Sequence, residues 1–361
     1  MSQSLEGRLA KQKGYLTQVQ RPLVLGRRPI PQPKGNQVLV KIIAAGINPH
    51  DQKGRDRGLL VGKHLLHAIL ANDISGIVEK VGPEVKRFSV GDRIFGQSNI
   101  LSGGPDQAGL QQFCILDADF AAPIPSHISF DEAATFPVNA IASFIALFSS
   151  SGLDLALNFL GQNSDYANEA IVIIGGASNS GKFALQFARH VGFGKIITTA
   201  KIRNDGGQSL RDLGASHVID REAADVEGQI RAIVGDELLY AFDTVNGSYT
   251  GSISHQLALS LLSTMRKGSL ATLVRGEADP DIAASKKAGF RKNQVLGVSD
   301  LHQELASMFW EMIPGWIEKG QLKPLDFRVI EGLDVGKVNA LLDDYRDGRT
   351  ATKTHVHPNL M

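Results

Sequence analysis

The chain has 361 residues, of which 43% are hydrophobic, and this length is sufficient for two domains that each bury a core. Its 38 basic and 37 acidic side chains are interspersed and give a formal net charge of +1. This balance argues against a nucleic acid or an anionic membrane as partner and favours a small molecule. No window approaches the roughly 18 consecutive apolar residues of a membrane span. No apolar leader opens the sequence and the single cysteine, Cys114, cannot form an internal disulfide, so we expect a cytoplasmic protein.

Two different sequence patterns predict two domains. From about residue 15 to 125, short alternating runs such as 38–43 and 74–81 are separated by glycines, a pattern typical of antiparallel strands. From about residue 135, helical spacing alternates with short apolar runs, which predicts βαβ units around a parallel sheet. The predicted strands of that sheet are Ala170–Ile174, Lys195–Ala200, His217–Ile219, Tyr240–Val245, Ser269–Val274 and Gln294–Val298.

The same patterns place the ends of the domains. One predicted helix stops at Gly192, and a later one, which contains Trp316, ends near Gly320. The segment 149–168 is rich in Gly, Ser and Asn and predicts a surface excursion. A last strand at 352–357 returns to the first domain. The prediction is therefore a domain of residues 1–135, completed by 321–361, and a second domain of residues 136–320.

The strongest chemical signal is a buried strand that leads into a loop of small residues, at 171–181. A pyrophosphate needs close approach to the backbone and the N–H groups of a helix N-terminus, and a bulky side chain there would block it. The loop is not a strict G-x-G-x-x-G, and a tight turn without a ligand is the alternative. The predicted dinucleotide-binding residues of the loop are Gly175, Gly176, Ser178, Asn179, Ser180 and Gly181.

The choice of cofactor is expected to be made after the second strand of this domain. An acid there would bind the ribose hydroxyl of NAD, but Lys201 and Arg203 follow the strand and could neutralise the 2′-phosphate of NADPH. We therefore predict NADPH; in the alternative, both cations are solvated and Asp205 turns inward. Further cofactor contacts are expected at Asn246 and Leu273, because ligands of such sheets bind at the carboxyl ends of the strands.

The order of these domains, together with two motifs, resembles a known family. The stretches 44–53 (AAGINPHDQK) and 91–96 (GDRIFG), followed by the glycine loop, are similar to the medium-chain dehydrogenases/reductases. The resemblance extends to their zinc-free quinone-reductase and enoyl-reductase branch, and to fungal trans-acting enoyl reductases and fungal alcohol dehydrogenase-like proteins. It implies an α/β fold with a GroES-like, mostly antiparallel β catalytic domain and a doubly wound, parallel-sheet Rossmann domain. It also implies an enzyme of secondary metabolism.

The positions that bind zinc in related dehydrogenases hold other residues here. Asn48 stands where a cysteine ligand is usual, residues 71–73 read Ala-Asn-Asp in place of Gly-His-Glu, and the four-cysteine structural loop is missing. Amide groups are poor ligands for a tetrahedral zinc ion, so no metal is expected. The pair His64 and His67 and the pair His355 and His357 each lack an evident third ligand.

The resemblance implies conjugate reduction, in which a hydride attacks the β-carbon of an unsaturated carbonyl and the α-carbon takes a proton. Lys53 matches a lysine of the polyketide enoyl reductases and is the first candidate for contact with the carbonyl oxygen or with nearby phosphate or ribose groups; a surface lysine is the alternative. Asn48 is a candidate amide donor, with a structural role in the turn as the alternative. His50 is a candidate proton donor, while Asp51 is expected to brace their loop.

Two further positions bear on the cofactor. Lys353 lies in a stretch that resembles the family's terminal Gly-Lys-x-Val pattern and is expected to reach the cofactor. Ala142 stands where relatives place a threonine near the nicotinamide ribose, with Ser143 as its substitute.

Together these residues predict an NADPH-dependent reductase of α,β-unsaturated carbonyls or enoyl thioesters. The acceptor is a small molecule, free or bound to an acyl carrier, and its pocket is expected to be built from loops 54–70 and 99–109. A quinone reductase and a non-catalytic NADPH-binding partner protein are the alternatives. The chain is expected to be a monomer or a homodimer, the latter paired through the edge strand predicted at Gln294–Val298.

Overall fold

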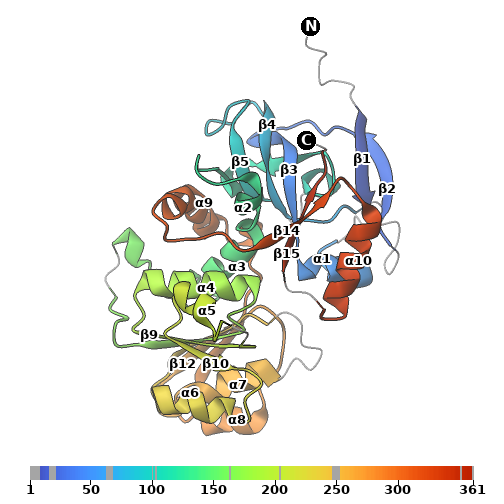
Figure 1. Cartoon of the computed structure of the whole chain (residues 1–361). Helices are drawn as coiled ribbons and strands as arrows, with labels where there is room; N and C mark the ends of the chain where they lie inside the picture. Colours follow the sequence, from blue (N-terminus) through green and yellow to red (C-terminus); the bar gives the residue numbers. More distant parts are fainter. Residues whose placement is uncertain are drawn as a thin grey trace. The chain divides into compact units, whose positions relative to one another are not determined.

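The computed structural model describes residues 22–61, 68–99, 101, 104–161, 164–202, 205–245, 253–349 and 352–359, and the backbone of one further strand at 9–15. The chain divides into two compact units, drawn in Figure 1: residues 1–138 with 298–361, and residues 139–297. The second unit ends at residue 297, whereas residue 320 was predicted. The difference arises because the helix α9 (Gln303–Glu318) packs on elements of the first unit.

The first unit is built on a seven-stranded, mostly antiparallel sheet with the order β14-β15-β3-β4-β5-β7, in which β6 also pairs with β3. A separate ribbon is formed by β1 and β2. The strands are β1 (Leu9–Tyr15), β2 (Val24–Pro29), β3 (Gln37–Ile47), β4 (Asp73–Val81), β5 (Arg93–Gln97), β6 (Phe113–Asp117), β7 (Ala121–Pro123), β14 (Phe327–Glu331) and β15 (Lys353–His357). The helices are α1 (Pro49–Arg57), α2 (Phe130–Ala134), α9 and α10 (Val335–Arg346), with short 3-10 turns at Gly104–Gln107, Ala118–Phe120 and Ser299–Leu301.

The second unit has a six-stranded parallel sheet with the order β10-β9-β8-β11-β12-β13. Figure 1 shows α4 and α5 on one face of this sheet and α6 and α7 on the other. The strands are β8 (Ala170–Ile174), β9 (Lys195–Ala200), β10 (His217–Asp220), β11 (Tyr240–Asp243), β12 (Gly268–Thr272) and β13 (Phe290–Gln294). The helices are α4 (Asn179–Val191), α5 (Gln208–Asp212), α6 (Val226–Val234), α7 (Ile253–Leu261) and α8 (Pro280–Ser285), with a 3-10 turn at Asn158–Leu160; α3 (Pro137–Phe148) begins at the unit boundary.

This architecture confirms the predicted pair of a mostly antiparallel GroES-like unit and a doubly wound Rossmann unit. In the second unit, β8 lies between β9 and β11, so the strand order reverses between β8 and β11. Ligands of open parallel sheets bind outside the carboxyl ends of the strands at such a reversal. The residues of β8 from Ile171 to Ile174 are buried, as expected of a strand covered on both faces.

Two local predictions in the second unit are wrong. The edge strand is Phe290–Gln294 rather than Gln294–Val298: it is mostly polar because it is half-buried, whereas Val295 and Val298 are buried beyond its end. The segment 149–168 is also not a plain surface excursion. Leu153 is buried, and its carbonyl accepts a hydrogen bond from Arg291 of β13 at 3.0 Å.

Candidate functional site

The loop between β8 and α4 requires glycine at three positions. Gly175 has a φ of +82°, a conformation that residues with a side chain rarely adopt. A Cβ at Gly176 would lie 2.1 Å from Thr198 Oγ1, and a Cβ at Gly181 would lie 2.3 Å from the carbonyl oxygen of Gly175. The loop therefore lies directly against β9, and α4 packs closely on the end of β8.

Threonines at the ends of the flanking strands hold this loop, and the sequence analysis missed them. The N–H of Gly175 donates to Thr199 Oγ1 in β9 at 3.1 Å. Thr244, which directly follows β11, has its Oγ1 2.9 Å from Ser178 Oγ and donates to the carbonyl of Ile174 at 2.8 Å. The available signal was a hydroxyl residue at the carboxyl end of each strand that flanks β8.

The first turn of α4 follows this loop directly. Ser178 is the N-cap, and its Oγ accepts from the N–H of Gly181 at 2.9 Å. The remaining first N–H groups of a helix, here those of Asn179 and Ser180, have no acceptor within the helix and carry the positive end of its dipole. An anionic pyrophosphate is the kind of group that such a terminus binds.

The side chain of Ser180 does not point out of the loop. It is buried, with Oγ 3.4 Å from Asn139 Oδ1, and its carbonyl accepts from Ser143 Oγ at 2.7 Å. Only the backbone of Ser180 is thus left for the predicted cofactor contact, and the hydroxyl of Ser143 is engaged by the carbonyls of Asn139 and Ser180. Ala142 lies against Gly297, where glycine is required because a Cβ would lie 2.3 Å from the Cα of Ala142.

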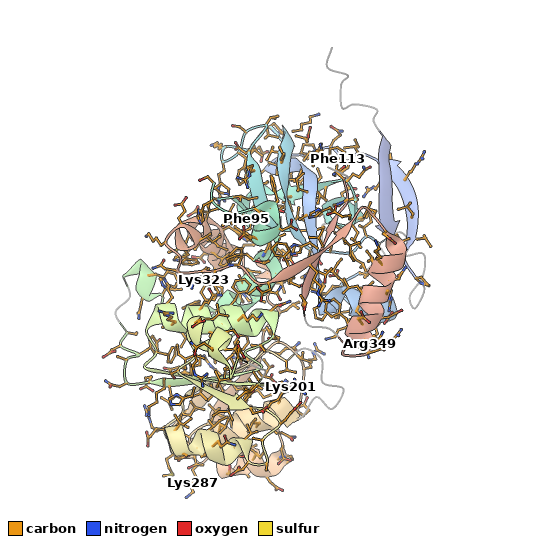
Figure 2. All side chains as sticks on the ribbon, viewed as in Figure 1. Phe95, Phe113, Lys201, Lys287, Lys323 and Arg349 are labelled. Atoms are coloured by element: carbon orange, nitrogen blue, oxygen red, sulfur yellow. The ribbon has the colours of Figure 1, made fainter. Side chains whose placement is uncertain are left out.

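The residues predicted to select the cofactor are only partly described. Lys201, labelled in Figure 2, is largely exposed and pairs with Glu222 at 3.0 Å. Asp205 does not turn inward: it accepts from Ser209 Oγ at 2.6 Å and from the N–H of Gly207 at 3.0 Å, and these hydrogen bonds lower its pKa to about 2. Leu273 is half-buried just after β12. Arg203 and Asn246 lie outside the described residues.

In the first unit, Asn48, Asp73 and Lys353 form one buried polar network. Lys353 Nζ makes an ion pair with Asp73 and donates to Asn48 Oδ1 at 2.9 Å. Asn48 Nδ2 donates to Asp73 Oδ2 at 2.6 Å, and the N–H of Val138 donates to Asp73 Oδ1 at 2.5 Å. The side chains of Asp73 and Lys353 are both 0% exposed.

This network contains two residues with predicted roles. Lys353 Nζ is held by Asp73 and Asn48, and the amide of Asn48 is engaged at both ends by Asp73 and Lys353. The physical reason is that a carboxylate inside the sheet must be paired, since an isolated buried charge is very costly. The sheet order β15-β3-β4 places the lysine beside Asp73.

These residues do not fit a tetrahedral zinc ion. Position 48 supplies an amide instead of a thiolate or imidazole, and the nearby carboxylate of Asp73 is already bound by the ammonium group of Lys353. Among the described residues, no group of three or more His, Cys, Asp or Glu side chains is suited to hold a metal ion.

The two histidines of β15 face an aspartate of α2. His355 Nδ1 and His357 Nε2 both lie 2.9 Å from Asp131 Oδ1, and His357 Nδ1 lies 3.4 Å from Glu331. Burial alone would raise the pKa of Asp131, but the hydrogen bonds from both histidines lower it to about 2. Burial lowers the pKa of His355, whereas the hydrogen bond to Asp131 raises the pKa of His357. The other pair, His64 and His67, lies outside the described residues.

Asp51 braces two neighbouring segments. It is 1% exposed; its Oδ2 accepts from the N–H of Asn48 at 2.7 Å, and its Oδ1 accepts from the N–H of Ala71 at 2.8 Å. Ala71 has a φ of +73°, an unfavourable conformation for alanine that these bonds help to hold. Asp51 thereby ties the start of α1 to the segment that precedes β4, in agreement with the bracing role expected of it.

His50 lines a cavity within the first unit. The apolar part of its wall comes from residues 59–61, 68–70, 101, 105 and 108, and the polar part includes His50, Asn72 and Asn99. The described residues of the wall thus include parts of both loops predicted to build the pocket. His50 Nε2 lies 2.8 Å from Asn72 Oδ1. Lys53 is half-buried on α1 and is not part of the wall; burial, and then the neighbouring Arg57, lower its pKa.

Among the described residues, no helix has both the length and the apolar character needed to cross a membrane.

Comparisons with known proteins add to this geometry. The chain matches the alcohol dehydrogenase GroES-like domain over residues 34–126 and the zinc-binding dehydrogenase model over residues 181–299. The trans-enoyl reductase tndF of Aspergillus flavipes is 28% identical over 357 residues, which cover 96% of this chain and 98% of that protein. The trans-enoyl reductase tazE of Aspergillus terreus is 30% identical over 224 residues, which cover 61% of this chain and 71% of that protein.

Solved structures show the same fold over the whole chain. An alcohol dehydrogenase superfamily protein from Novosphingobium aromaticivorans has a TM-score of 0.78 at 26% identity, with 96% of this chain and 99% of that chain covered. The CurK enoyl reductase has a TM-score of 0.73 at 20% identity, with 97% and 99% covered. The two family models, the relatives and the fold agree, and the chain therefore belongs to the medium-chain dehydrogenase/reductase superfamily of nicotinamide-dependent oxidoreductases.

Proposed function

We propose that the protein is an NADPH-dependent reductase of a carbon–carbon double bond conjugated to a carbonyl or thioester group, and that it serves secondary metabolism. The observation that carries the proposal is the cavity of the first unit, whose wall combines apolar side chains with the imidazole of His50. The likeness to trans-enoyl reductases over nearly the full chain supports it. Conjugate reduction needs a positioned acceptor, a hydrogen-bond donor and a proton source, which such a cavity can supply.

The second unit fits a dinucleotide. Side chains at Gly176 and Gly181 would collide with Thr198 and with the backbone of Gly175, so glycine is required here for the tight strand-to-helix turn that a pyrophosphate site needs. The N–H groups of Asn179 and Ser180 at the start of α4 would hold that anion. When bound, the cofactor supplies a hydride to the acceptor.

The surroundings of β9 support NADPH over NADH. Asp205 is the acid that could have bound the ribose hydroxyl. Its carboxylate instead accepts hydrogen bonds from the N–H of Gly207 and from Ser209 Oγ. Lys201 follows the strand, and its ion pair with Glu222 joins two side chains that are each more than half exposed. Exposed ion pairs are weak, so Lys201 can exchange Glu222 for a ribose phosphate, with Arg203 as a second cation.

The cavity favours an acceptor with an apolar part. Leu59 and Leu101, both in its wall, are 44% and 43% exposed, so apolar surface continues from the cavity to the solvent. Burying such surface against a hydrocarbon is favourable by about 25 cal/mol per Å². An enoyl group with an alkyl chain, free or bound to an acyl carrier, matches this environment.

His50 is the proposed proton donor to the α-carbon. Its side chain lines the cavity and is 20% exposed, so the ring can be reprotonated from solvent after each turnover. Lys53 lies on the same helix but outside the cavity wall, and its contact with the carbonyl oxygen, on which negative charge develops during the reaction, is proposed from the family resemblance alone.

The test follows the loss of reduced-nicotinamide absorbance while the purified protein meets a crotonyl thioester, an enone and an ortho-quinone, with NADPH and NADH in parallel. We expect consumption of NADPH with the thioester or the enone. Turnover of the quinone alone would identify a quinone reductase instead. Tight binding of NADPH without consumption of any acceptor would identify a non-catalytic binding protein and contradict the proposal.

A further inference from the structure

His50 is held by a short chain of side-chain hydrogen bonds. The resemblance to the family gives no role to the other members of this chain. Its Nε2 lies 2.8 Å from Asn72 Oδ1, and Asn72 Nδ2 donates to Ser98 Oγ at 2.7 Å. Asn72 directly precedes β4 and Ser98 directly follows β5, two strands that pair antiparallel. The N–H of Ser98 also donates to the carbonyl of Asn72 at 3.1 Å, so backbone and side chain both fix this pair.

The chemistry of the partners decides where the imidazole carries its proton. An amide oxygen has lone pairs and no hydrogen, so the ring nitrogen that faces it must be an N–H. A carboxylate oxygen of Asp51 lies 3.8 Å from the same nitrogen and favours a hydrogen there. Asp51 stays fixed in this position because its two oxygens also accept backbone N–H groups from Asn48 and Ala71.

We propose that Asn72 is a positioning residue that keeps the neutral ring of His50 protonated at Nε2, so that Nδ1 is the nitrogen that gives and takes the proton in catalysis. This inference rests on the proposed function, because it assigns the proton of conjugate reduction to one atom. Ser98 supports Asn72 through their hydrogen bond. Asp51 supports Asn48 and Ala71, which lie just before His50 and Asn72 in the chain.

In the proposed step a proton moves from His50 Nδ1 to the α-carbon of the substrate. After hydride has reached the β-carbon, the substrate is an enolate and the His50 ring carries protons on both nitrogens. The Nδ1–H bond breaks, its electron pair stays on Nδ1, and the enolate's electron pair forms the new C–H bond at the α-carbon. The ring is left neutral with its remaining proton on Nε2, held by Asn72, and Nδ1 regains a proton from solvent.

The backbone conformation of the preceding residue, Ala71, fixes the position of Asn72. Ala71 adopts a left-handed conformation, with a φ of +73°, which is unfavourable for an alanine. It is held by Asp51, which accepts from its N–H, and by Gly109, whose N–H donates to its carbonyl at 2.7 Å. Such a conformation persists only where the surroundings over-determine it, and here it directs the next residue toward His50.

The test reads the protonated nitrogen directly by nitrogen NMR of the full-length protein with ring-labelled histidine. His355 gives an internal reference for the opposite form, because its Nδ1 faces Asp131. We expect His50 to carry its proton on Nε2 in the wild type, and Asn72→Leu to shift it toward Nδ1. In the same variant, kcat for the enoyl thioester should fall on the order of 100-fold, the typical worth of general acid catalysis, with little change in KM.

Two further variants separate positioning from simple damage to the fold. Asn72→Asp keeps an acceptor facing Nε2 and adds charge, so it should retain the Nε2 proton and move the basic limb of the pH–rate profile upward, even if Asn72→Leu folds poorly. Asn158→Leu is the matched control: it removes an amide of the second unit that bonds to Ser164, and it should leave both the NMR signals of His50 and kcat unchanged.

The outcomes are distinguishable. A wild-type ring protonated at Nδ1, an unchanged tautomer in Asn72→Leu, or an unchanged kcat despite a changed tautomer would each overturn the inference. Failure of the proposed function has another signature. The wild type would then reduce no conjugated acceptor, while the NMR spectrum still reported whether Asn72 sets the tautomer.

Discussion

The glycine loop of the second unit and the polar network of the first unit organise their residues by different physical means. The loop is local: Gly175, Gly176 and Gly181 lie close together in the sequence, and what matters is the absence of side-chain atoms. The network joins Asn48, Asp73 and Lys353, which are far apart in sequence, and what matters is that each charge is paired. A site of the first kind should fail when one atom is added, and a site of the second kind when one charge is removed.

The largest effect is expected from breaking the charge pair of the network. Lys353→Met leaves Asp73 buried without its cation, which should lower the free energy of unfolding by about 3–5 kcal/mol in denaturant titrations. Lys353→Met combined with Asp73→Asn should recover much of this loss, because the stranded charge is gone. If Lys353→Met alone were as stable as the wild type, the network would not be held by charge pairing.

The next effect comes from adding one atom to the loop. Gly181→Ala places a Cβ 2.3 Å from the carbonyl oxygen of Gly175, so it should cost about 1–3 kcal/mol of stability and weaken NADPH binding in a fluorescence titration. Gly315→Ala in α9 is the matched control, since its Cβ would meet no atom within 4 Å. That control should be neutral or stabilise by up to about 1 kcal/mol. Equal behaviour of the two variants would contradict the crowding argument.

A third prediction concerns pH and the attachment of β15 to α2. The pKa of Asp131 is lowered from 3.8 to about 2, so its contribution is present above pH 3.8 and is lost as the pH falls toward 2. The raised pKa of His357 adds stability below 6.5, which is lost at higher pH. Asp131→Asn should therefore cost most between pH 4 and 6.5, by about 2 kcal/mol, in unfolding measured across pH. A loss that does not vary with pH would mean that Asp131 acts by packing alone.

The smallest effect on stability is expected at the cofactor-selecting cations. The double variant Lys201→Ala, Arg203→Ala should change stability by less than about 0.5 kcal/mol, because the ion pair that Lys201 makes with Glu222 is exposed and weak. It should nevertheless reduce the preference for NADPH over NADH by about 10-fold or more in kcat/KM, since hydrogen bonds to a charged phosphate are worth about 1.5–3 kcal/mol. Glu222→Gln, which releases Lys201, should leave or increase that preference. An unaltered ratio in the double variant would place phosphate recognition elsewhere.

The contrast between the two regions also explains what the sequence could predict. The bounds of β8 and β9 and the end of α4 at Gly192 follow from local patterns, since apolar runs and a left-handed glycine depend little on distant residues. The edge strand β13 could not be located in this way, because its residues are polar and the apolar ones follow it.

The roles of the polar side chains were harder to predict for the same reason. Whether Lys353 is buried depends on β15 pairing with β3, which in turn pairs with β4, and no local pattern reveals this order. The support that Thr199 and Thr244 give the glycine loop likewise depends on which strands flank β8. The positions of Lys201 and Asp51 could be named from the sequence, whereas their partners Glu222 and Ala71 could not.

The most direct test of the account supplies NADPH deuterated at the transferable position together with a crotonyl thioester, and locates the label in the product by NMR. The account predicts deuterium at the β-carbon and a solvent-derived hydrogen at the α-carbon, with the second transfer slowed in Asn72→Leu. Label at the carbonyl carbon, or turnover confined to the ortho-quinone, would contradict conjugate reduction as the activity of this protein.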